Sequence, residues 1–100
     1  MESYNKLVRD GISKILDAKG VPYEKRVASP EEYKDELVKK LGEEIEEFKA
    51  DLSVEELADV LEVIEAVKRL PEYADVEKIR QQKLAERGGF EQRIILKGEK

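Results

Sequence analysis

The stretch LVKKLGEEIEEF, residues 37–48, decides the fold, because its apolar side chains recur at the spacing of one helix face. With about 100° of rotation per residue, the apolar positions of this segment lie within roughly 60° of the direction of Leu41. They are Leu37, Val38, Leu41, Ile45, Phe48 and Leu52. Such a stripe predicts an amphipathic helix that buries one face.

The acidic run inside this helix divides into two pairs. Glu44 falls at about −60° and Glu47 at about −120° from Leu41, so both border the apolar stripe. Glu43 falls at about 200° and Glu46 at about 140°, which is the solvent side. Neighbouring carboxylates in one run are therefore expected to have different surroundings.

Two helix-capping motifs predict where this helix and the next one begin. Ser29-Pro30 followed by Glu32, and Ser53 followed by Glu56, match the capping box that opens a helix. The apolar periodicity predicts four helices, over residues 4–18, 30–50, 53–70 and 72–87. The expected fold is an all-α bundle of about four helices in a single domain, residues 1–100. Residues 21–27 and 94–96 leave open a short β pairing.

The helix expected at residues 53–70 carries a second acidic pair, Glu56 and Asp59. Taking Leu57 as zero, Glu56 lies at about −100°, inside a wide apolar arc, and Asp59 at about −160°, at its margin. One small chain can hardly cover an arc this wide. A homodimer or a dimer of dimers is expected, with this helix near the interface.

Each acidic pair has i, i+3 spacing, so both of its side chains project the same way. If the two helices form an antiparallel hairpin, the pairs converge, and a divalent cation offsets their repulsion. Carboxylate-only ligands favour Mg²⁺ or Mn²⁺. Two alternatives stay open: the acidic run is a solvated helix face, and Glu56 is simply the capping partner of Ser53.

Composition excludes several classes of function. The chain has no cysteine and no histidine, which removes disulfides, thiol nucleophiles and catalytic sites built on histidine. With 19 basic and 24 acidic residues its net charge is −5, which disfavours a nucleic acid polymer or a membrane surface as partner. No targeting segment is recognisable, so the cytoplasm is the expected location.

Three segments together resemble one enzyme family. The residues EEIEE at 43–47, followed by ELADVLE at 56–62, resemble the E-E-x-x-E … E-x-x-D signature of the MazG-like all-α nucleoside triphosphate pyrophosphohydrolases. The residues YNKLVRD at 4–10 and RGGF at 87–90 resemble the start and the end of a small house-cleaning branch that is expected to cleave non-canonical nucleotides.

This resemblance implies a reaction and a site. Mg²⁺ is expected on Glu44, Glu47, Glu56 and Asp59, and a nucleoside triphosphate is expected to be cut between its α- and β-phosphates. Glu43 and Glu44 are the implied catalytic residues, with Glu43 accepting a proton. Basic side chains must offset the remaining phosphate charge. The candidates are Lys6, Arg9, Lys83 and Arg87, each of which also has the simpler interpretation of a surface charge.

Two other functions remain possible from the sequence. The first is a phosphoribosyl-ATP pyrophosphohydrolase of histidine biosynthesis, although the segments 4–10 and 87–90 favour the house-cleaning branch. The second is a non-enzymatic acidic helical oligomerisation module. Such a module has no need to place Glu44 and Glu56 inside apolar arcs.

Overall fold

The computed structural model describes residues 5–99, which form an all-α fold with four helices and no strand. The elements are α1 (Ile12–Lys19), α2 (Pro30–Ala50), α3 (Val54–Lys68), a single 3₁₀ turn η1 (Pro71–Tyr73) and α4 (Val76–Arg87). The predicted fold class and number of helices are confirmed. Within the described residues no helix is long and apolar enough to cross a membrane.

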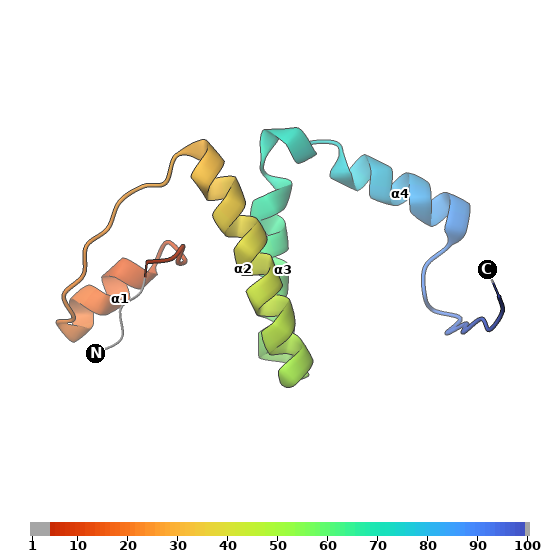
Figure 1. The fold of residues 1–100 in the computed structure, drawn as a ribbon, viewed down its shortest axis with the longest axis horizontal. Coiled ribbons are helices and arrows are strands. Elements are labelled where there is room, and N and C mark those ends of the chain that lie inside the picture. The colour runs from red at the N-terminus through yellow and green to blue at the C-terminus, as the bar shows by residue number, and fades with distance from the viewer. Residues whose placement is uncertain (1–4, 100) are drawn as a thin grey trace.

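An antiparallel hairpin of α2 and α3 forms the centre of the molecule (Figure 1). Both helices begin as predicted: the Ser29 hydroxyl oxygen accepts a hydrogen bond from the Glu32 backbone N–H, and Ser53 does the same for Glu56, each at 3.2 Å. Only Asp51, Leu52 and Ser53 separate the two helices. A connection this short forces α3 to run back along α2.

The hydrophobic core is small and lies toward the end of the hairpin at which α2 begins and α3 ends. Its buried members are Leu37, Val63 and Leu70. Tyr33, Leu41, Val67 and Tyr73 are partly buried against them, and so is Leu7 from the segment before α1. Burial of these side chains supplies the main free energy that holds the hairpin together.

The other two helices diverge from the hairpin as separate arms. Figure 1 shows α1 on one side of the hairpin and α4 on the other. The chain extends over 56 × 32 × 25 Å, with a Cα radius of gyration of 18.1 Å. A compact domain of this length has a radius of gyration of about 13 Å. Within one chain, the bundle is therefore limited to α2 and α3.

Three element predictions differ from the structure. Helix α1 begins at Ile12 and not near residue 4, since residues 5–9 form no helix and Leu7 packs on the core; Tyr4 lies outside the described residues. Helix α4 begins at Val76, because the residues after Pro71 first form a 3₁₀ turn. The β pairing of residues 21–27 with 94–96 is wrong for the described chain, since these segments lie on opposite sides of the hairpin (Figure 1).

The position of the core predicts the effect of truncating Leu37, which is 4% exposed. We expect Leu37→Ala to lower the free energy of unfolding by about 2–5 kcal/mol, because it removes contacts and leaves a cavity. Leu96→Ala is the control, since Leu96 is 90% exposed and should change stability by less than about 0.5 kcal/mol. Urea unfolding followed by circular dichroism measures both. Equal effects of the two substitutions contradict this description of the core.

Candidate metal centre

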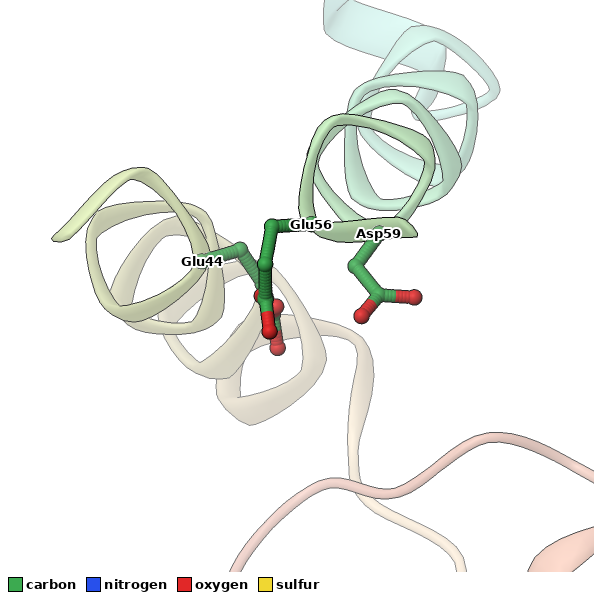
Figure 2. A group of neighbouring side chains, drawn as sticks. All are labelled: Glu44, Glu56 and Asp59. Carbon is green, nitrogen blue, oxygen red and sulfur yellow. The ribbon is translucent and has the colours of Figure 1, made fainter. Parts of the chain in front are cut away.

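Three carboxylates from the two hairpin helices meet at one place. Glu44 of α2 and Glu56 and Asp59 of α3 each offer an oxygen, and these three oxygens lie within 4.8 Å of one another. Figure 2 shows the three side chains projecting to the same side of the hairpin. The predicted convergence of acidic groups from both helices is therefore present, with three members.

Glu44 is the most deeply placed of the three, at 8% exposure. Its Oε1 atom lies 3.4 Å from the ammonium group of Lys40, one turn earlier on α2. Its Oε2 atom is buried and has no hydrogen-bond partner. A buried carboxylate oxygen without a hydrogen-bond donor lowers the stability of the fold. Its burial is therefore not explained by its contribution to folding. A bound cation would explain it.

The carboxylate of Glu56 is in a similar position, with a buried Oε2 atom that lacks a partner. The capping alternative does not account for it. In a full capping box this carboxylate would accept the Ser53 backbone N–H, but that N–H donates to the Asp51 carbonyl oxygen at 2.7 Å. Only the backbone of Glu56 takes part in the cap, so its side chain is free to bind something else.

The pKa of Glu56 is shifted by the surroundings of its carboxyl group. Burial raises the pKa of its carboxyl group, and the nearby negative charges of Glu47, Asp59, Asp51 and Glu44 raise that pKa further, in this order. The charged form is therefore disfavoured in the absence of a cation. A divalent ion at the three converging oxygens would offset the repulsion and favour the charged form.

The spacing of the three oxygens is close to what a metal ion requires. Two oxygens that bind the same Mg²⁺ at about 2.1 Å lie at most about 4.2 Å apart. The three oxygens lie within 4.8 Å, so small side-chain rotations bring them to this range. Oxygen-only ligands match Mg²⁺ and Mn²⁺. The residues present therefore fit such an ion.

Two basic side chains from different parts of the chain reach the carboxylates. The Arg9 guanidinium donates to Asp59 Oδ1 at 2.9 Å, which places this predicted phosphate-binding residue beside the cluster. Lys40 was not predicted as a site residue, although its i, i+4 spacing to Glu44 was a signal for an ion pair. Lys6, also a predicted phosphate ligand, is exposed on the same non-helical segment as Arg9.

The remaining predicted site residues lie outside the three-carboxylate cluster. Glu47 is exposed on α2, yet close enough to raise the pKa of Glu56. Glu43 is exposed on the same helix. Lys83 and Arg87 are exposed on α4, which runs away from the hairpin (Figure 1). One chain does not bring these two basic residues to the carboxylates.

Comparison with known proteins adds no relative: no family model, no curated protein and no solved structure matches the chain.

The unpartnered oxygens predict that a divalent cation stabilises the fold. With Mg²⁺ at about 100 times its Kd, we expect about 2.7 kcal/mol of added stability, because only the folded hairpin brings the ligands together. Glu44→Gln should abolish this gain, and in EDTA its melting temperature should equal or exceed that of the wild type. Glu46→Gln is the matched control, since the Glu46 side chain is 73% exposed. Thermal unfolding with and without Mg²⁺ measures the shift, and identical behaviour of the two variants rules out the cluster as its source.

The raised pKa of Glu56 predicts how stability depends on pH without metal. A carboxyl group whose pKa is higher in the folded than in the unfolded state binds more protons when folded. Its contribution is therefore fully present below the ordinary carboxyl pKa and is lost as pH rises through the raised value. In EDTA, Glu56→Gln should be more stable than wild type at pH 7.5, and this difference should shrink as pH falls toward 4.5. A difference that is constant across this range contradicts the assignment.

Proposed function

We propose that this protein is a Mg²⁺-dependent nucleoside triphosphate pyrophosphohydrolase that acts on non-canonical nucleotides. The observation that carries the proposal is the pair of buried, unpartnered carboxylate oxygens of Glu44 and Glu56 beside Asp59. It supports a divalent metal site, and the resemblance of the sequence to MazG-like enzymes supports the type of reaction. Mn²⁺ is the expected substitute for Mg²⁺.

Glu44, Glu56 and Asp59 would hold the metal ion, with Glu47 as the nearest further carboxylate. When bound, Mg²⁺ neutralises phosphate charge and lowers the pKa of water. The hairpin contributes geometry, because both helices fix their ligands in place before substrate arrives. The two helices thus serve as a rigid support for a carboxylate site.

Hydrolysis adds one water molecule across the α–β phosphoanhydride, so that a nucleoside monophosphate and pyrophosphate leave and one proton is released. Glu43 is the proposed acceptor of this proton, directly or through a second water. It lies next to Glu44 on α2 and is exposed to solvent, so it can pass the proton on.

Phosphate charge needs basic groups as well as metal. Arg9 is the best-placed candidate, because its guanidinium already contacts Asp59 at 2.9 Å. It can turn from the carboxylate to a phosphate oxygen when a cation takes over the charge of Asp59. Lys6 lies three residues earlier on the same segment. Lys83 and Arg87 can contribute only if α4 of another chain reaches the carboxylates.

The activity prediction compares substitutions of acidic residues at the site with the same kind of substitution at an exposed position. Wild-type protein with Mg²⁺ should release pyrophosphate, not orthophosphate, from at least one member of a panel of canonical and damaged nucleoside triphosphates. Glu44→Gln, Glu47→Gln and Asp59→Asn should abolish turnover, because each keeps the side-chain shape but removes a negative charge at or beside the three converging oxygens. Glu46→Gln should stay within a few-fold of wild type, as an exposed charge paired only with Lys49.

The same assay separates the alternatives. Activity restricted to phosphoribosyl-ATP would assign the protein to histidine biosynthesis. Stepwise release of orthophosphate would place the cut at the outer phosphates. A pure protein that binds Mg²⁺ but is inert on the whole panel with either metal would overturn the enzymatic proposal and favour an acidic oligomerisation module.

A further inference from the structure

Arg9 connects the N-terminal part of the chain to the candidate metal centre. Its guanidinium donates to Asp59 Oδ1 at 2.9 Å, although the two residues are fifty positions apart. Among the described residues before α2, Arg9 is the one that forms an ion pair with a residue of the cluster. In Figure 2 the pale red ribbon of the N-terminal segment, residues 5–11, runs past the side toward which the carboxylates project. The N-terminal segment therefore borders the candidate metal centre.

Leu7 provides a second contact between the N-terminal segment and the hairpin. It packs against the hydrophobic core from a position two residues before Arg9. Helix α1 begins three residues after Arg9 and diverges from the hairpin (Figure 1). The position of α1 therefore depends on what holds Leu7 and Arg9 in place.

Two basic side chains already offset part of the negative charge of the three carboxylates. The ammonium group of Lys40 lies 3.4 Å from Glu44 Oε1, and Arg9 contacts Asp59. The three carboxylates carry three negative charges when ionised, of which these two cations offset two. A divalent ion on the three oxygens adds two positive charges to a group that the guanidinium already contacts, and like charges this close disfavour each other. The metal ion and Arg9 therefore compete for Asp59.

Arg9 is the cation that can leave. Lys40 is one turn from Glu44 on the same helix, and its side chain is 24% exposed, so it stays near the site whether or not a metal binds. The Arg9 side chain is 58% exposed and extends from a segment that forms no helix. An ion pair this exposed to solvent contributes little to stability. A divalent cation can therefore displace Arg9 from Asp59.

We propose that Arg9 is an internal counter-cation of the candidate metal centre, which holds the N-terminal segment against Asp59 until a divalent cation displaces it. The inference rests on the metal site of the proposed function, but not on the reaction. Because linkage is reciprocal, the Arg9 contact weakens metal binding by the same factor by which the metal weakens the contact. The displaced guanidinium is then free to bind a phosphate oxygen, so the contact restrains the site until the metal ion is in place.

Titration calorimetry with Mg²⁺ tests the competition. Arg9→Gln should tighten Mg²⁺ binding by about two- to tenfold, because it removes an exposed ion pair and a nearby positive charge. Arg26→Gln is the matched control, since the Arg26 side chain is 61% exposed and pairs with Glu32 at 2.6 and 2.7 Å. Glu32 lies about 18 Å along α2 from Glu44, beyond the range of unscreened charge at physiological salt. Arg26→Gln should therefore leave the dissociation constant unchanged.

A distance measurement follows the N-terminal segment itself. The chain has no cysteine, so spin labels can be attached through Lys14→Cys on α1 and Glu62→Cys on α3, both at exposed positions. Saturating Mg²⁺ should broaden the distribution of distances between the two labels, because α1 loses one of the contacts that hold it. Adding Arg9→Gln should broaden the distribution without Mg²⁺ and remove most of its response to the ion.

The outcomes separate this proposal from the enzymatic one. Weaker Mg²⁺ binding by Arg9→Gln would show that Arg9 supports the metal ligands and would overturn the proposal, as would equal affinities of Arg9→Gln and Arg26→Gln. A wild-type distance distribution that Mg²⁺ leaves unchanged would also overturn it. Wild-type protein that binds no Mg²⁺ would overturn the metal site and this proposal together. Tighter binding by Arg9→Gln in a protein that releases no pyrophosphate would support the competition and contradict only the enzymatic proposal.

Discussion

The packing of α2 against α3 is the constraint on which the rest of the structure depends. Leu37, Val63 and Leu70 form the buried part of this contact, and the short connection at residues 51–53 fixes its direction. The same contact brings Glu44 opposite Glu56, so the hydrophobic packing that stabilises the hairpin also forces carboxylates together. The core and the candidate metal centre are therefore two parts of one helix–helix contact. A change in the packing of α2 against α3 would also change the distance between the carboxylates.

The sequence predicted the two helices of the hairpin and most of the acidic centre, because both follow from helical phase. Glu44 was expected beside the apolar stripe and is 8% exposed, whereas the Glu46 side chain, two residues later, was expected in solvent and is 73% exposed. The serine caps of both helices were also predictable, since Ser29 and Ser53 act on backbone atoms three residues ahead. Local periodicity carries this information without any knowledge of tertiary contacts.

Contacts between distant segments were beyond the reach of the sequence. Nothing in the pattern of residues 4–18 indicated that residues 5–9 form no helix, that Leu7 joins the core, or that Arg9 reaches Asp59 fifty residues later. Glu47 has the same i, i+3 relation to Glu44 as Asp59 has to Glu56, yet it lies outside the group of three converging oxygens. Its distance from α3 depends on how the helices cross, which periodicity does not determine.

Two features of the hairpin limit the stability of the single chain. Glu44 and Glu56 each bury an oxygen without a partner, which weakens the metal-free fold. Val38 and Leu61 are more than half exposed, so these apolar side chains add little to the stability of the single chain. A chain with so small a core has little stability to lose at the carboxylates. A cation that partners the two buried carboxylate oxygens would therefore add stability that the small core does not supply.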